Sequence, residues 1–262
     1  MAGALLALGS GSLIGLVLGL IGGGGSILAV PLLVYAVGVP PHIAIGTAAF
    51  AVALNALASL GLHARRAPIR WPCAIAFSAA GVAGALLGAT LGKAIDGRQL
   101  LALFGLLMIV VGILMMRPKP AAAVSSERLS LANARRLLPR LLFAGLAVGT
   151  LSGFFGIGGG FLILPGLMLA ADMDVSDAAS ASLVGVAAFG TASASSYAWS
   201  GLIDWQIAAL LVAGGFVGAV AGSRANAALA QNKERLSRLF AWFVAAAGLY
   251  VAGRGVLSIL AA

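Results

Sequence analysis

Two glycine-rich stretches carry the backbone groups best suited to bind a small anion. Gly15–Pro31 (GLVLGLIGGGGSILAVP) and Gly149–Pro165 (GTLSGFFGIGGGFLILP) each place several glycines inside an apolar run. Glycine lowers helix stability, and a broken helix leaves backbone N–H groups free. At the start of a short helix such amides carry partial positive charge and can receive an oxyanion. The candidate binding residues are Gly22, Gly23, Gly24, Gly25, Ser26 and Ile27, and Gly156, Gly158, Gly159, Gly160 and Phe161.

Polar side chains on the next apolar run form a second candidate set. Asn55 and Ser59 lie four residues apart, so they share one face of a helix. Ser193 is the counterpart of Ser59 in the second half of the chain, and Ser182 lies close to the same face. Hydroxyl and amide groups can donate to the oxygens of an anion. Ordinary hydrogen bonding between membrane helices, worth about 0.6 kcal/mol per bond, explains these residues equally well.

Other chemistries fit the glycines and the rare ionisable residues less well. A phosphate-binding loop requires a Lys-Ser or Lys-Thr pair after its glycines, and neither cluster has one. The single cysteine, Cys73, excludes an internal disulfide and a cysteine-based metal cluster. We therefore expect no metal and no cofactor. Close packing of helices through small residues is the remaining alternative for the glycine clusters.

The composition is that of a protein embedded in a membrane. Of 262 residues, 61% are hydrophobic and 9% are charged, whereas a soluble domain carries roughly 25% charged residues. The net charge of +9 comes from lysines and arginines in the loops between apolar runs, as the positive-inside rule describes, so we expect no nucleic-acid partner. The runs Ser26–Val37 and Phe161–Ala171 are too short to cross a bilayer alone. They are predicted to be half-helices that leave the glycine breaks.

The two halves of the chain resemble each other at a constant offset of 134 residues. This offset pairs Trp71 with Trp205 and Pro31 with Pro165, together with the glycines around them. We therefore predict a tandem duplication, with transmembrane repeat 1 over residues 1–116, a cytoplasmic linker over 117–140 and transmembrane repeat 2 over 141–262.

The charges of equivalent loops predict that the second repeat is inverted in the membrane. The loop His63–Arg70 contains three arginines, whereas its counterpart, Tyr197–Asp204, contains no basic residue. The first loop should face the cytoplasm, and the second loop and both termini the outside. Matched helix breaks in two inverted halves are typical of a transport site. The predicted fold is an all-α polytopic membrane protein of two tandem inverted-topology repeats with glycine-broken helical hairpins.

The duplicated motifs resemble a known family. Each glycine segment is followed by an A-x-G-T or A-x-S-A-S helix (Ala44–Thr47 and Ala178–Ser182), then by I-x-W and a glycine ladder. This set resembles the sulfite exporter TauE/SafE family of bacterial membrane proteins over nearly the whole chain. The resemblance implies transport of small anions, such as sulfite and organosulfonates, across the inner membrane. It also adds Thr47 to the candidate substrate-binding residues.

We therefore expect a multi-pass transporter of the bacterial inner (cytoplasmic) membrane that exports small sulfur-containing anions such as sulfite or sulfoacetate-like organosulfonates. Alternating access would expose the two glycine breaks near the midplane to each side in turn. The alternatives are an anion channel and a carrier of another small organic anion. An enzyme would need an ionisable cluster within the membrane, and the apolar runs contain none. The expected partners are the anion and the lipid bilayer, and a homodimer is allowed but not required.

Overall fold

Helices account for almost all of the described chain. The computed structural model describes residues 2–21, 23–63, 69–116, 134–173, 175–228 and 233–260, and no strand occurs among them. The first half contains α1 (Ala2–Ile21), the 3-10 helix η1 (Gly23–Leu28), α2 (Ala29–Pro31), the π-helical η2 (Leu32–Val37), α3 (Pro41–His63), α4 (Trp71–Ala94) and α5 (Gly97–Met116). The second half contains α6 (Ala134–Phe155), α7 (Gly160–Ala171), α8 (Val175–Trp199), α9 (Trp205–Ala228) and α10 (Lys233–Leu260).

Six of the described helices are long and apolar enough to cross a membrane. They are α3, α4, α5, α6, α8 and α9. Ser26–Val37 and Gly160–Ala171 are shorter apolar helices, in agreement with the half-helices expected from the sequence. Helices α4 and α9 begin at Trp71 and Trp205, whose side chains are exposed, as expected of aromatic residues that anchor helices at the membrane interface. The prediction of an all-α polytopic membrane protein is confirmed.

Helix α6 begins before the boundary that hydropathy suggests. The first apolar run of the second half starts at Leu141, but α6 starts at Ala134. Its first two turns carry Arg135, Arg136 and Arg140, which are exposed. The residues 134–140, assigned above to the linker, therefore form the polar end of a longer helix.

Helices of the first half pack against helices of the second half. Helix α1 packs along α9, and its counterpart α6 packs along α4. Two further contacts, α3 with α8 and α5 with α10, each join equivalent helices of the two halves. Glycine permits the close approach, because a Cβ at Gly15 would overlap the carbonyl of Gly215 and a Cβ at Gly149 would overlap that of Gly81. The glycine ladders of α4 and α9 are thus packing surfaces.

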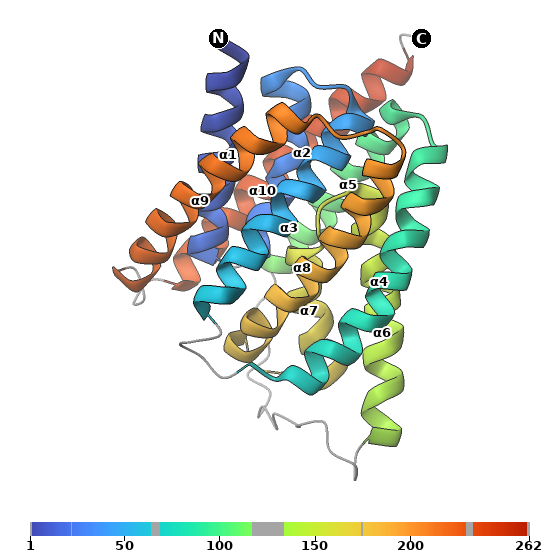
Figure 1. Cartoon of the computed structure of the whole chain (residues 1–262), viewed down its shortest axis with the longest axis vertical. Coiled ribbons are helices and arrows are strands. Elements are labelled where there is room, and N and C mark those ends of the chain that lie inside the picture. Colours follow the sequence, from blue (N-terminus) through green and yellow to red (C-terminus); the bar gives the residue numbers. More distant parts are fainter. Residues whose placement is uncertain are drawn as a thin grey trace.

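The course of the helices defines two ends of the bundle. In Figure 1 both termini lie at the upper end, α1 runs downward from there, and α6 runs upward from the lower end. Helix α3 ends and α4 begins at the lower end, whereas α8 ends and α9 begins at the upper end. The assignment of these ends to the two sides of a membrane stays a prediction.

Candidate functional site

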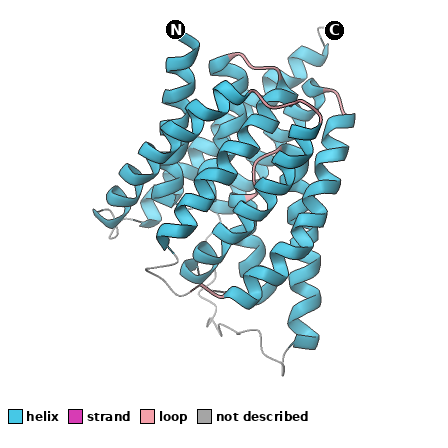
Figure 2. Ribbon diagram, viewed as in Figure 1, coloured by secondary structure: helices cyan, strands magenta, loops and turns pink. Residues whose placement is uncertain are grey.

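The second glycine segment forms an open turn inside the bundle. Figure 2 shows this turn as a loop surrounded by helices, between the end of α6 and the start of α7. Gly156, Gly158 and Gly159 have φ angles of 63°, 65° and 71°, in the left-handed region. A Cβ at Gly156 would also lie 2.7 Å from the carbonyl oxygen of Ile45 on α3. Only glycine fits this backbone without strain.

Four consecutive amides of this turn have no backbone partner. The amides of Gly156 and Ile157 donate back to carbonyls of α6, at 3.3 and 3.2 Å, and those of Leu162 and Ile163 donate to the Gly159 carbonyl. Between them lie the amides of Gly158, Gly159, Gly160 and Phe161, which form no backbone hydrogen bond of normal geometry within the described chain. All four residues are buried. Buried N–H groups in proteins are almost always paired, so this group of donors is suited to an oxyanion.

Ser152 adds a side-chain donor to the same turn. Its hydroxyl is fully buried and has no hydrogen-bond partner in the described chain. A Cβ placed on Gly159 would lie 2.8 Å from Ser152 Oγ, so the hydroxyl is directed at the turn. Ser152 is not among the site residues expected from the sequence. Its counterpart in the first half is Leu18, so comparison of the two halves does not point to a serine at this position. Its place next to Gly153, a repeated glycine, could have marked it as a candidate.

The first glycine segment has a different backbone. Gly23–Leu28 forms the 3-10 helix η1, whose dihedral angles are right-handed. The amides of Ser26 and Ile27 lie inside this helix, where the i→i+3 hydrogen-bond pattern uses them. Both residues are fully buried. Gly22 lies outside the described residues.

The two glycine segments nevertheless meet. Helix η1 contacts α7, which begins at the open turn, and both contact α8. The two predicted amide groups therefore lie in one region of the bundle, and the open donors come from the second segment.

Two of the predicted side chains already form hydrogen bonds within the protein. Thr47 Oγ1 accepts from the backbone amide of Asp204 at 3.0 Å, which ties α3 to the start of α9. Ser182 Oγ donates to the carbonyl of Ala179 in its own helix at 2.8 Å. Both side chains are fully buried. These contacts agree with a structural role for both side chains.

Asn55 and its repeat counterpart Phe189 lie in equivalent places. A Cβ at Gly215 on α9 would overlap the amide of Asn55, and a Cβ at Gly81 on α4 would overlap the ring of Phe189. The structure therefore brings Asn55 to the α3–α9 interface, where it fills the space that an aromatic ring fills in the other half.

Ser59 and Ser193, a matched pair, differ in their surroundings. Ser59 is half-buried and has an interaction partner. Ser193 is fully buried, and its hydroxyl has no partner among the described residues. Of the predicted side chains, Ser193 is therefore better placed than Ser59 to offer a free donor inside the bundle.

The described acidic residues lie at or near the ends of helices. Asp177, in the first turn of α8, forms a salt bridge with Arg70 at the start of α4, at the lower end of the bundle. Asp172 follows α7, Asp96 precedes α5 and Asp204 precedes α9. No group of three or more metal-binding side chains occurs among the described residues.

The bundle of membrane-spanning helices with a buried glycine turn is that of a polytopic membrane transporter, and the comparisons with known proteins agree. A model of the family described as "Sulfite exporter TauE/SafE" matches residues 7–251. The chain belongs to this family.

Several curated relatives carry transporter names. A "Probable membrane transporter protein" of Xylella fastidiosa is 43% identical over 258 residues, which cover 98% of each chain. The "Probable membrane transporter protein YdhB" of Bacillus subtilis is 25% identical and covers 81% of this chain and 86% of its own. No solved structure matches the chain. The protein is a multi-pass membrane transporter, and its relatives are not named as enzymes.

Proposed function

We propose that this transporter exports a small sulfur-containing oxyanion, such as sulfite or a sulfoacetate-like organosulfonate, across the bacterial inner membrane. The observation that carries the proposal is the group of four buried amides at Gly158–Phe161, which lack backbone partners within the described chain, with the Ser152 hydroxyl beside them. Sulfite and sulfonates present several oxygens on one sulfur atom. They can therefore accept from several N–H and O–H donors at once.

A site made of amides and a hydroxyl suits an anion that must be released again. Such donors provide partial positive charge without a buried cation, whose desolvation in a membrane is costly. Selection would depend on the number and direction of the acceptor oxygens. The printed name of the family supports sulfite as the first anion to test.

The same proposal includes alternating access by two inverted repeats. Its support is the matched packing of α1 on α9 and α6 on α4, and the opposite course of α1 and α6 in Figure 1. Rocking of one half against the other would open the glycine turn to each side in turn. Cysteines placed in the loops 64–68 and 200–204 of a Cys73→Ala background should be labelled from opposite sides of the membrane. Labelling of both from one side would contradict the inverted topology.

Binding and flux measurements test the substrate class. We expect purified protein in detergent to bind sulfite or a sulfonate in titration calorimetry, with chloride and acetate as control anions. In proteoliposomes, uptake of the bound anion should saturate and should accelerate when the same anion is present on the other side. Binding of carboxylates alone would refute the sulfur-anion assignment. Flux that neither saturates nor responds to anion on the far side would indicate a channel.

A further inference from the structure

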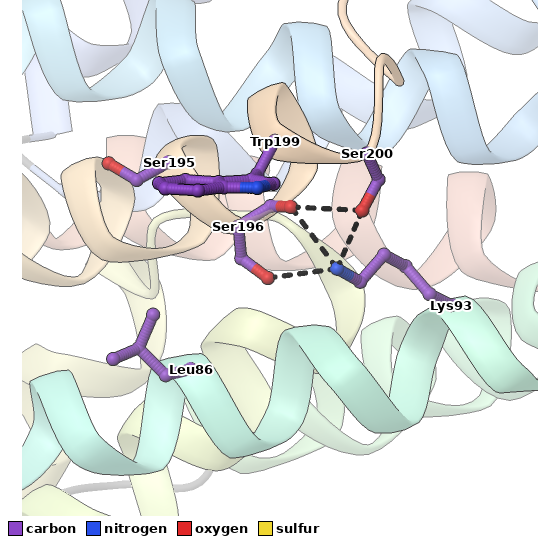
Figure 3. A pocket seen from close by; sticks show the side chains of 6 residues that line it. All are labelled: Leu86, Lys93, Ser195, Ser196, Trp199 and Ser200. Carbon is purple, nitrogen blue, oxygen red and sulfur yellow. Dashed lines mark hydrogen bonds between the residues drawn. The ribbon is translucent and has the colours of Figure 1, made fainter.

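A second polar site lies between α4 and α8, at the upper end of the bundle. A pocket of about 330 Å³ is lined by Leu86, Lys93, Ser195, Ser196, Trp199 and Ser200. Figure 3 shows the Lys93 ammonium pointing from α4 toward the last turns of α8. The pocket joins the two halves of the chain, because α4 belongs to the first and α8 to the second.

Three oxygens hold the Lys93 ammonium in place. Lys93 Nζ donates to the carbonyl oxygen of Ser196 at 3.1 Å, to Ser196 Oγ at 3.0 Å and to Ser200 Oγ at 2.9 Å. These acceptors are neutral, and no carboxylate forms a salt bridge with Lys93 in the described chain. At the lower end, by contrast, Arg70 is neutralised by Asp177. Lys93 therefore leaves a net positive charge in the wall of the pocket.

The other end of the pocket is mainly apolar and faces outward, because the Ser195 hydroxyl at this end donates to the Thr191 carbonyl of its own helix. Leu86 lies seven residues before Lys93 on α4, about 10 Å deeper along the helix. Its side chain is 42% exposed, and that of Trp199 is 94% exposed. Exposed apolar side chains on a membrane-spanning bundle are covered by lipid. A positively charged and hydroxylated upper end above a mainly apolar lower end matches the shape of a phospholipid, with its phosphate above its acyl chains.

We propose that this pocket binds one anionic phospholipid at the upper membrane interface. The headgroup phosphate lies against Lys93 and accepts from the Ser196 hydroxyl, whose oxygen already accepts from the lysine. An acyl chain lies along Leu86 and beside the indole of Trp199. The bound lipid bridges α4 and α8 and thus stabilises the contact between the two halves at this end. This site shares no lining residue with the glycine turn and does not depend on the identity of the transported anion.

Quenching of Trp199 fluorescence by brominated lipid tests the proposal. A full-length variant with Trp71, Trp205 and Trp242 replaced by phenylalanine keeps Trp199 as its only tryptophan. It is placed in nanodiscs of phosphatidylcholine with increasing fractions of brominated phosphatidylglycerol. We expect Trp199 to prefer the anionic lipid over brominated phosphatidylcholine by about fivefold, the ratio that one lysine near a membrane surface provides.

Variants of the pocket decide between specific and general attraction. Lys93→Gln should reduce the preference to near unity, and Lys93→Arg should retain most of it. Ser196→Asp places a carboxylate beside the ammonium while keeping its hydrogen-bond acceptor, so it should also abolish the preference if the glutamine variant does not fold. The matched control is Arg98→Gln, which removes one positive charge from the same end of the bundle, and it should leave the preference unchanged.

Two results would overturn the proposal. The first is an unchanged preference for the brominated anionic lipid in Lys93→Gln or in Ser196→Asp. The second is displacement of the lipid by millimolar sulfite in the otherwise unmodified single-tryptophan protein. Displacement would show that the pocket takes the small free anion and not the lipid phosphate.

Discussion

The Ser152 hydroxyl offers the sharpest test of the glycine-turn site, because a ligand-binding role and a structural role predict different results. Its oxygen is fully buried, lacks a partner among the described residues and faces Gly159. We expect Ser152→Ala to weaken anion binding without weakening the anion-free protein. A hydroxyl that stabilised the fold would give the reverse.

The expected magnitudes follow from the chemistry of a buried hydroxyl. An unpaired polar group costs about 1–3 kcal/mol when buried, so removing it should leave the stability of the anion-free protein unchanged or raise it by up to about 1 kcal/mol. A hydrogen bond to a charged ligand is worth about 1.5–3 kcal/mol. Its loss should therefore weaken anion binding by about 10- to 150-fold.

Both quantities can be measured on one protein preparation. The midpoint of thermal unfolding in detergent reports the stability without anion, and titration calorimetry reports the affinity. The matched control is Ser78→Ala on α4, because the Ser78 hydroxyl is also buried and without a partner in the described chain but belongs to neither glycine segment. Its variant should behave like Ser152→Ala in stability and should bind the anion normally.

Two outcomes would refute the assignment of Ser152. Normal anion affinity in Ser152→Ala would show that the hydroxyl does not contact the ligand. A lower unfolding midpoint together with equal losses of affinity in Ser152→Ala and Ser78→Ala would show a general effect on the helix packing.

Three further predictions concern the turn and the residues around it. Gly159→Ala should lower the unfolding midpoint more than Gly24→Ala. A left-handed φ costs an alanine about 1–2 kcal/mol, whereas the 3-10 backbone at Gly24 carries no such cost. Equal midpoints would contradict the difference between the two segments. Asp177→Asn should lose the salt bridge with Arg70 and about 1 kcal/mol of stability but retain anion flux. Loss of flux in a well-folded variant would place Asp177 in the transport path. Asn55→Ala should weaken anion binding, measured by calorimetry, less than Ser152→Ala does, because the Asn55 amide packs on α9. Abolished binding would move the site to α3.

Local properties of the chain were sufficient to predict the helices and the kind of protein. Apolar run length and rare charge predicted a polytopic membrane protein, and the two short apolar runs are short helices in the structure. The glycine clusters and the prolines after them correctly marked the two interrupted segments. The duplicated motifs also indicated the family, because they combine many residues at fixed spacing.

The end of a helix in polar sequence was less predictable. Hydropathy placed the start of the second half at Leu141, but α6 extends back to Ala134 through exposed arginines. A helix can continue into water at little cost, because its hydrogen bonds are internal. The apolar run therefore does not define its length.

Repeat symmetry in the sequence did not carry over to the site. The two glycine segments look equivalent, yet one forms the 3-10 helix η1 and the other an open left-handed turn. Likewise, Asn55 and Phe189 fill equivalent spaces with different chemistry, and Ser152 has only Leu18 as its counterpart.

The sequence by itself determined that this chain is a helical membrane protein with two similar glycine-interrupted segments. Those features depend on residues that lie near each other in the chain. Tertiary structure alone decided which amides stay unpaired, because the turn at Gly156–Gly159 is shaped by Ile45 on α3 and Ser152 on α6. It also decided that Lys93 faces serines of the other half. Such contacts join residues about 100 positions apart, as between Lys93 and Ser196, and helical periodicity or spacing within one half does not specify them.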